Sequence, residues 1–521
     1  MKARLLFSDR DFDPKRPLPW NADALTRDLA LDTVFQAMAR KDDFVLEVAK
    51  QALFQGVEND ASTIVHRQNL LRDGLAHPEL LRQLYALAEE AVEIQRRHWL
   101  GSLSRFPSWT LNWGVGLLGD LLSLIRRLRD LVDAQSGASF GREWSAFFSM
   151  IQSELSDDYL GSLAQHLKNM KFEGGVMFSS RLGDGDRSVE YVLHRPPAQR
   201  FSWFERLFPP KQPGFGFDIH PRDEAGARAL EDLRARGIAS ISQTVGQSAD
   251  HVRSFFHMLR VELAFYVGCL NLHEDIAQRG AEVCFPDAAP AEAGKLSFRG
   301  LYDLGLALRQ EQPVVGNDAD ADGRALVLVT GANQGGKSTF LRSVGVAQLM
   351  LQAGMFVPAQ ALSASLRDGV FTHYKREEDL TLSSGKLDEE LGRMSEIVDH
   401  LTPKPLILFN ESFAATNERE GSEIARQILS ALLEKPVEIV CVTHLYELAH
   451  GFAESGTQGV LFLRADRRND GSRTFHLVEG EPLRTSFGDD LYRAVFGEAA
   501  DRAEAASQRS RAAREGLPSP G

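Results

Sequence analysis

The stretch "ALVLVTGANQGGKST" (residues 325–339) decides the fold of this 521-residue chain. An apolar run leads into a glycine-rich turn that fits the pattern G-x-x-x-x-G-K-[ST], and the helical pattern "TFLRSVGVAQLMLQAG" follows at once. Strand, glycine-rich turn and helix in this order are the context in which the pattern binds phosphate. The alternative is a glycine turn that arose by chance, but such a turn would not need a strand before it and a helix after it. The sequence therefore predicts a phosphate-binding loop.

The residues of this loop have separate expected roles. Gly331, Gly335 and Gly336 allow the backbone to approach closely, so that amide groups and the start of the helix face the phosphates. Lys337 is expected to reach the β- and γ-phosphates, and Ser338 to ligate Mg²⁺. ATP and Mg²⁺ are therefore the predicted cofactors.

Two further apolar runs predict the sheet that carries the loop. "LILF" (406–409) and "VEIVCVT" (437–443) do not alternate between apolar and polar residues, and neither does "ALVLVT" (325–330). Strands of this kind are buried on both faces, as in a parallel sheet covered by helices. The helical pattern "SEIARQILSALLEK" joins the last two runs and makes a βαβ unit. The expected fold is an α/β P-loop ATPase domain, with a mostly parallel sheet flanked by helices, preceded by a largely α-helical core and lever domain.

The run "LILFNESFAATNE" (406–418) ends in Asn410 and Glu411, where many ATPases have an Asp-Glu pair. Asn410 keeps an oxygen for Mg²⁺ but removes one charge, and a unit charge pair at ~4 Å is worth roughly 4 kcal/mol at an effective dielectric near 20. Glu411, the group that would polarise water, is retained. The favoured interpretation is a slow ATPase, and the alternative is a nucleotide switch without hydrolysis.

Two more motifs lie near this strand end. "LSSGK" (382–386) resembles the signature loop of ABC-type ATPases, in which a serine closes the nucleotide site of another subunit; Ser383 and Ser384 are the candidates. An ordinary helix N-cap at either serine is the alternative. His444 follows the last apolar run and is a candidate γ-phosphate contact, although a histidine after a strand is often incidental.

The rest of the chain divides by pattern into further segments. Residues 1–135 carry helical spacing, and residues 136–220 contain a helix, a hairpin around Gly183-Asp184-Gly185 and an arm rich in proline, aromatics and arginine. Residues 221–295 are helical again, residues 296–500 form the expected ATPase domain, and residues 501–521 are an expected frayed tail.

Composition limits the classes of function. The chain is 43% hydrophobic and 25% charged, with a net charge of −13, which is ordinary for a soluble globular protein and does not make the whole molecule a polyanion binder. Its three cysteines lack metal-ligand spacing and favour a reducing compartment. The most apolar stretch, residues 99–125, is interrupted by charges and is expected to be a buried helix. We expect a cytoplasmic protein with no membrane segment.

Four stretches together resemble the ATPase domain of the MutS family of DNA mismatch-repair and recombination proteins. They are "LVTGANQGGKSTFLRSVGVAQLMLQAGMFVPA" (328–359), "LSSGKLDEELGRMSEI" (382–397), "LILFNESFAATNEREG" (406–421) and "VTHLYELA" (442–449). Upstream, "STIVHRQNLLRDGLAHPELLRQL" (62–84) and "SFFHMLRVELAFYVGCLNL" (254–272) resemble the helices of the family's core and lever domains.

The resemblance implies roles for individual residues. Glu411 falls on the catalytic glutamate, His444 on the switch histidine, and Ser384 or Ser383 on the residue that acts across a dimer. His476 corresponds to a family position near the adenine, and Ser338 with Asn410 to the Mg²⁺ site. The nucleotide-binding loop takes in Gly331, Asn333, Gly335, Gly336, Lys337, Ser338 and Thr339.

The resemblance also implies a short form of the family. The chain starts in what resembles the helical core, so the mismatch-recognition and connector domains are expected to be absent. The implied function is a homodimeric ATPase that binds duplex, mismatched or branched DNA, with a repair protein as a further partner. The alternative is a nucleotide-gated protein scaffold without DNA contact. A transporter ATPase subunit is disfavoured by the long helical half.

DNA contact is expected on basic residues beside the hairpin. Basic and aromatic side chains together suit backbone contact and base stacking. A linker bounded by prolines, with its aromatics docked on the core, is an equal alternative. The candidates are Lys168, Lys171, Arg195, Arg200, Arg206 and Lys211, with Phe201, Trp203 and Phe204.

Overall fold

The computed structural model describes residues 1–98, 106–172, 175–194, 218–332, 334–376, 385–468 and 472–483, which belong to two compact units. The first, which we call the helical unit, comprises Met1–Leu5, Asp9–Phe12 and Ala76–Leu263. The second, the sheet unit, comprises Leu6–Ser8, Asp13–Leu75 and Ala264–Gly521.

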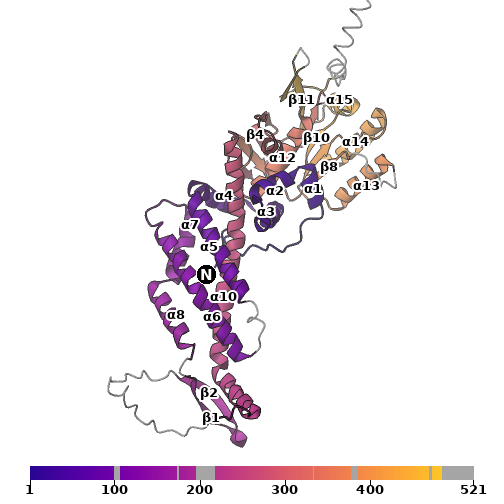
Figure 1. The fold of residues 1–521 in the computed structure, drawn as a ribbon. Coiled ribbons are helices and arrows are strands. Elements are labelled where there is room, and N and C mark those ends of the chain that lie inside the picture. Colours follow the sequence, from indigo (N-terminus) through magenta and orange to yellow (C-terminus); the bar gives the residue numbers. More distant parts are fainter. Residues whose placement is uncertain are drawn as a thin grey trace, which may run out of the picture. The chain divides into compact units, whose positions relative to one another are not determined.

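The helical unit is a bundle that ends in a small hairpin (Figure 1). Its helix α6 packs against the other four helices of the bundle. Leu117, Leu121, Leu124 and Leu128, spaced by three and four residues, are buried in this bundle. The helices are α5 (Pro78–Arg97), α6 (Pro107–Asp133), α7 (Arg142–Glu154), α8 (Asp157–Asn169) and the part of α10 (Glu224–Gln278) up to Leu263.

The predicted hairpin is confirmed. Strands β1 (Met177–Leu182) and β2 (Ser188–His194) pair antiparallel, and a short 3₁₀ turn, η3 (Asp184–Asp186), joins them. Gly185 has φ +70°, a conformation that glycine adopts without steric cost. The proline- and aromatic-rich arm that follows lies outside the described residues.

The sheet unit is built on a six-stranded sheet in the order β12-β11-β6-β10-β9-β8. Neighbouring strands from β11 to β8 pair parallel, and only β12 pairs antiparallel, with β11, so the predicted mostly parallel sheet is confirmed. The strands are β6 (Leu326–Thr330), β8 (Val370–Tyr374), β9 (Leu406–Asn410), β10 (Glu438–Val442), β11 (Val460–Arg467) and β12 (Arg473–Glu479).

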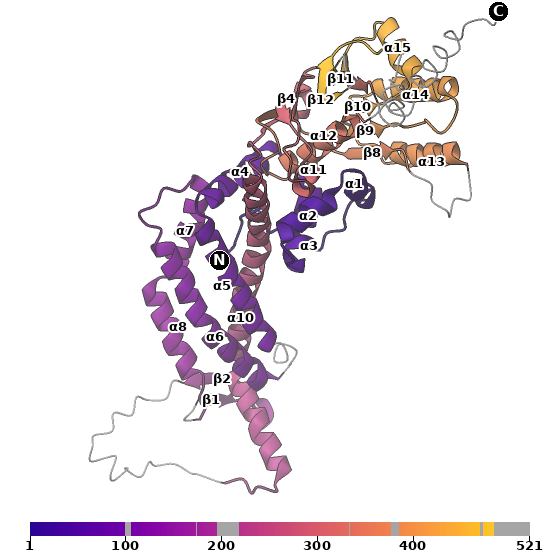
Figure 2. The same ribbon diagram turned by 45° about the horizontal axis from the view of Figure 1, so that its top comes forward.

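Helices cover both faces of this sheet (Figure 2). Ile407 and Phe409 of β9 belong to a buried cluster with residues of three helices: α13 (Lys386–Asp399), α14 (Glu418–Leu433) and α15 (Tyr446–Glu454). Leu408, which points to the opposite face, lies against Gly345 of α12 (Lys337–Gln352). The alternation of contacts along β9 explains why its residues 406–409 are all apolar.

A second, four-stranded sheet stands beside the first and was not foreseen from the sequence. Its order is β3-β7-β4-β5, and its strands are β3 (Asp287–Ala289), β4 (Leu296–Leu301), β5 (Asn317–Asp320) and β7 (Ala361–Ser365). The short helix α11 (Leu304–Arg309) follows β4, with Asp303 as its N-cap: the Asp303 side chain accepts a bond from the Leu306 N–H at 3.0 Å.

The first helices of the chain pack in the sheet unit, although the sequence grouped them with residues 76–135. They are α1 (Ala22–Asp28), α2 (Leu31–Ala39), α3 (Asp43–Gln55), η1 (Gly56–Glu58) and α4 (Ala61–Ala76). Asn21 Nδ2 donates to Val370 O at 2.8 Å, and Thr372 Oγ1 donates to Asp28 Oδ2 at 2.7 Å. Apolar periodicity predicted these helices but cannot say which surface they bury against: α1 packs on β8, α2 on α11, and α3 on α12.

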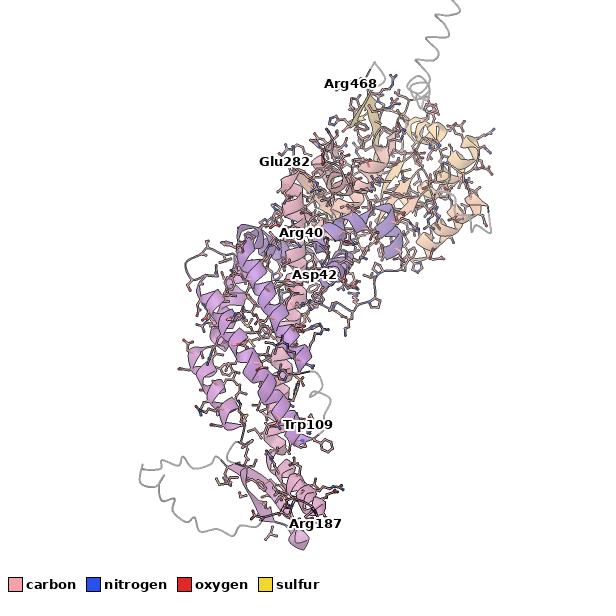
Figure 3. The ribbon with its side chains drawn as sticks, viewed as in Figure 1. Arg40, Asp42, Trp109, Arg187, Glu282 and Arg468 are labelled. Carbon is pink, nitrogen blue, oxygen red and sulfur yellow. The ribbon has the colours of Figure 1, made fainter. Side chains whose placement is uncertain are left out.

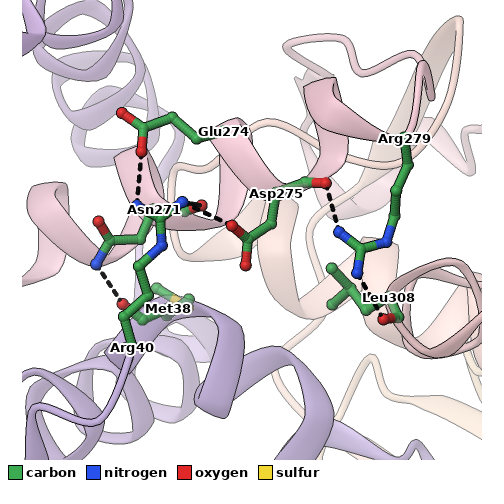
Figure 4. A network of polar contacts seen from close by, with 7 residues as sticks. All are labelled: Met38, Arg40, Asn271, Glu274, Asp275, Arg279 and Leu308. Atoms are coloured by element: carbon green, nitrogen blue, oxygen red, sulfur yellow. Dashed lines mark hydrogen bonds and ion pairs between the residues drawn. The ribbon is translucent and has the colours of Figure 1, made fainter.

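Arg40, at the end of α2, is linked by hydrogen bonds and ion pairs to the last turns of α10 (Figure 4). Its guanidinium donates to Glu274 at 2.7 Å, to Asp275 at 2.6 Å and to the Asn271 carbonyl oxygen at 3.0 Å. The Asn271 amide in turn donates to Met38 O at 2.8 Å. These groups thus hold the end of α10 as part of the sheet unit.

In the described part of the chain, α10 is the one helix whose length and apolar content would suffice to cross a membrane. Of its most apolar window, 83% is buried within the protein, as in the core helix of a soluble protein. In α6 the Trp113 side chain is buried, whereas Trp109 is 63% exposed and projects away from the helix (Figure 3).

Candidate nucleotide-binding site

The predicted phosphate loop lies between β6 and α12, at the carboxyl end of the parallel strands. Gly331 has φ +114°, and a Cβ atom there would lie 2.9 Å from the backbone nitrogen of Ala465 on β11. Gly336, with φ +86°, is the N-cap of α12. Both the left-handed conformation and the close strand exclude larger residues at Gly331. The glycines thus set the shape of the loop.

The loop forms one wall of a cavity of about 830 Å³. Gly335, Lys337, Ser338 and Thr339 line it from α12 and the loop, and Glu411 and His444 line it from the ends of β9 and β10. The other described lining residues include Tyr302, Asp303, Leu306, Pro313, Val314, Val315, Asn317, Lys375 and Phe475. The structure therefore brings the predicted loop, the predicted acid and the predicted histidine to one cavity.

Lys337 is held inside the loop. Its side chain is almost fully buried, and Nζ donates to Gly331 O at 2.9 Å and to Ala332 O at 3.0 Å. Burial lowers the pKa of Lys337 because it penalises the charged form, while Glu411 opposes this shift. A buried ammonium group held by carbonyl oxygens is poised to donate hydrogen bonds to phosphate oxygens.

Asn410 contacts the loop directly. Ser338 Oγ donates to Asn410 Oδ1 at 2.8 Å, so two oxygen atoms from α12 and β9 lie side by side. Mg²⁺ is bound by oxygen ligands and keeps several waters and phosphate oxygens, so this pair fits it as a partial ligand set. Among the described residues no cluster of three His, Cys, Asp or Glu side chains could hold a metal ion by itself. Ser338 and Asn410 would therefore share Mg²⁺ with the phosphates.

Glu411 has the geometry of a constrained functional residue. It has φ +51°, and its backbone N–H donates to Val442 O at 2.8 Å. His444 Nδ1 lies 3.8 Å from Glu411 Oε2, a separation that is too long for a hydrogen bond. The pKa of Glu411 is lowered chiefly by the His444 imidazole, and further by the ammonium groups of Lys337 and Lys375. Glu411 is therefore ionised at neutral pH.

A buried histidine behind Glu411 was missed in the sequence. His373 Nε2 lies 2.9 Å from the Glu390 carbonyl oxygen of α13, and because a carbonyl only accepts, Nε2 carries the proton. His373 Nδ1 lies 2.7 Å from Ser412 Oγ, next to Glu411 in the chain. The ring also stacks on Phe413. His373 thus ties α13 to the residues that follow β9, a link that only the pairing of β8 with β9 reveals.

Phe475, and not its neighbour His476, lines the cavity at strand β12. Phe475 lines the cavity and is held there by Asn317, whose Nδ2 donates to Phe475 O at 3.4 Å and whose Oδ1 accepts from Leu477 N–H at 2.7 Å. His476 lines a neighbouring cavity of about 600 Å³ instead. Tyr302, Pro313 and Val314 line both cavities. The predicted adenine contact at His476 stays a prediction.

Three of the residues predicted for the nucleotide site lie outside the described part of the chain: Asn333, Ser383 and Ser384. Helix α13 begins at Lys386 with Gly385 at its N-cap, so this helix does not use either serine as its cap. The role of Ser383 or Ser384 across a dimer stays a prediction.

Comparison with known families gives two matches, one to the mostly helical residues and one to the residues of the six-stranded sheet. Residues 59–279 match the MutS2 N-terminal domain, and residues 327–501 match MutS domain V. The second match contains the loop, Asn410, Glu411 and His444. The chain belongs to the MutS family. Its P-loop domain is similar to MutS domain V, and residues 59–279 are similar to the MutS2 N-terminal domain.

Curated MutS proteins are similar over parts of the chain. Human MutS protein homolog 4 is 31% identical over 307 residues, which are 57% of this chain and 31% of the human protein. The DNA mismatch repair protein MutS of Thermotoga petrophila is 36% identical over 156 residues, or 30% of this chain and 20% of that protein. The MutS of Chloroflexus aurantiacus is 33% identical over 142 residues, or 26% and 15%. The chain thus spans under a third of the length of these relatives.

Proposed function

We propose that this MutS-family chain binds ATP with Mg²⁺, hydrolyses it slowly, and couples the nucleotide to DNA binding in mismatch repair or recombination. The observation that carries the proposal is the convergence on one cavity of Lys337, Ser338, Glu411 and His444, with Asn410 bonded to Ser338. This set supplies phosphate binding, metal ligands and a carboxylate for water. The match to MutS domain V and the names of the relatives support the biological context.

The residues divide the work of hydrolysis. Lys337 gives up its bonds to the loop carbonyls and takes phosphate oxygens, while the start of α12 faces the same phosphates. Mg²⁺, when bound, neutralises charge on the phosphates. Glu411, ionised at neutral pH, accepts a hydrogen bond from the attacking water and orients it. His444 lies beside the Glu411 carboxylate and faces the same cavity.

The slow rate follows from Asn410. Its amide oxygen contacts Ser338 as a carboxylate oxygen would, but it adds no negative charge near the metal. Mg²⁺ is therefore held less tightly, whereas Glu411 and Lys337 remain for the chemistry. We place the defect in metal retention and not in the attack of water.

We further propose a cytoplasmic homodimer in which Ser383 or Ser384 of one subunit closes the site of the other, and in which hydrolysis reopens the dimer. DNA, with a repair protein as a second partner, would contact the helical unit. Lys168 and Lys171, at the end of α8, have solvent-exposed side chains there. So does Arg187, at the turn of the hairpin (Figure 3). The basic candidates from Arg195 to Lys211 lie outside the described residues.

The test is ATP turnover with and without duplex, mismatched and branched DNA. We expect slow turnover that DNA alters, and its loss in Glu411→Gln but not in Glu447→Gln, a matched change at an exposed site on α15. DNA binding measured in parallel should weaken steeply with salt, because phosphate contacts release counterions. ATP binding without turnover in any mixture, and without retention on DNA, would refute the proposal and favour a nucleotide-gated protein scaffold.

A further inference from the structure

Lys375 is a second lysine in the nucleotide cavity, and no motif of the sequence accounts for it. It follows β8 directly and lines the cavity together with Lys337, Glu411 and His444. Its side chain is exposed, in contrast to the buried Lys337. A cation on the open side of a phosphate cavity can reach a ligand that enters there.

The sheet fixes the position of Lys375. Tyr374, the last residue of β8, is the register partner of Asn410, and the Lys375 N–H donates to Asn410 O at 2.9 Å. Lys375 therefore emerges at the same edge of the sheet as Asn410 and Glu411, and one residue beyond the strand. Its place is set by backbone pairing and not by a loop.

The charge of Lys375 is available for a ligand. Within the described ranges, no carboxylate forms an ion pair with its ammonium group. The same ammonium contributes to lowering the pKa of Glu411, so its field reaches the carboxylate that faces the attacking water. Because residue 410 is an asparagine and not an aspartate, the edge of the sheet beside Lys375 carries one negative charge fewer.

We propose that Lys375 binds the γ-phosphate of ATP as a second protein cation, which makes triphosphate recognition less dependent on Mg²⁺. The inference rests on the proposed ATP site. A lysine ammonium is a compact point charge that suits a phosphate oxygen. Because Lys337 approaches from the loop and Lys375 from the end of β8, the two ammonium groups contact the phosphates from different elements. Lys375 thus offsets in part the weaker metal retention caused by Asn410.

The inference makes Lys375 a determinant of ATP over ADP. ADP lacks the group that Lys375 would contact, whereas Lys337 and the loop bind both nucleotides. Removal of the Lys375 charge should therefore weaken ATP much more than ADP. The difference should be largest without Mg²⁺, when no other mobile cation neutralises the γ-phosphate.

The experiment measures the Kd of ATP and of ADP by calorimetric titration, with Mg²⁺ and with EDTA. The full-length proteins are wild type, Lys375→Gln, Lys375→Arg, and Lys435→Gln as a matched exposed lysine beyond the end of α14. In EDTA we expect Lys375→Gln to weaken ATP about tenfold, equivalent to about 1.4 kcal/mol, and ADP less than about twofold. Lys375→Arg should retain ATP, and Lys435→Gln should match wild type.

The possible outcomes separate the inference from the function on which it rests. Equal losses for ATP and ADP, or no loss, in a protein that binds ATP as wild type would overturn the role of Lys375 and leave the ATP site standing. Failure of the wild-type protein to bind ATP under any condition would overturn both.

Discussion

Replacement of Asn410 by aspartate should lower the Mg²⁺ requirement of the protein. The carboxylate can accept the Ser338 hydroxyl as the amide does now at 2.8 Å, so the fold should be unchanged. Two unit charges about 4 Å apart interact by roughly 4 kcal/mol at an effective dielectric of 20. Asn410 is half-buried, so solvent screens part of this, and we expect a net gain of about 1.5 kcal/mol in Mg²⁺ binding.

A gain of this size corresponds to about a tenfold lower half-saturating Mg²⁺ concentration. The assay is a Mg²⁺ titration of ATP turnover at saturating ATP, repeated as a titration of fluorescent-ATP binding. Asn169→Asp, an exposed position on α8, adds the same charge away from the site and should leave the titration unchanged. An unaltered Mg²⁺ midpoint in Asn410→Asp would show that the lost charge is not what weakens metal retention.

Three further predictions test the site and its support. Lys337→Met should weaken ATP binding by about 100-fold or more in the fluorescent-ATP assay, because one cation and its charge-assisted bonds to phosphate are lost; a smaller loss would contradict the assigned role. Burial lowers the pKa of His373 from 6.5 to about 4, so below pH 6.5 the unfolded state takes up a proton that the folded state does not. The free energy of unfolding should therefore fall as the pH drops from 7 to 5, by about 2 kcal/mol from this group, and urea unfolding of His373→Gln should show a shallower pH dependence. Asp303→Asn keeps the N-cap oxygen of α11 but leaves Arg342, now 2.7 Å from the Asp303 carboxylate, without its ion pair; we expect a loss of about 1–3 kcal/mol, and unchanged urea unfolding would contradict it.

The sequence was informative where a local pattern and its chemistry coincide. The phosphate loop, the parallel strands β6, β9 and β10, the helix α14 between the last two, and the long helix α10 all follow from apolar periodicity and glycine placement. The convergence of Glu411 and His444 on the loop could be predicted because parallel strands end at one edge of a sheet. These features depend on neighbours that are close in the chain.

What could not be predicted depends on long-range pairing. The strands β3 and β5 are short and carry aspartates, so no strand pattern marks them. Strand β8 contains Thr372 and His373, whose burial depends on bonds to Asp28 and Ser412. In the sequence Lys375 only opens a charged run. The pairing of β8 with β9 is what places it at the nucleotide cavity. The packing of α1 to α3 in the sheet unit was beyond local pattern for the same reason.

The close fit between the phosphate loop and β11 has a consequence for sequence variation. Cβ atoms built on Gly331 and Gly335 would lie 2.9 Å from Ala465 N and 2.8 Å from Ala465 Cβ. The small side chain of Ala465 is therefore as much a requirement of the loop as the glycines, although it is distant in the chain and does not line the cavity. In a deep mutational scan for ATP binding, position 465 should tolerate alanine and glycine alone, and it should covary with the loop.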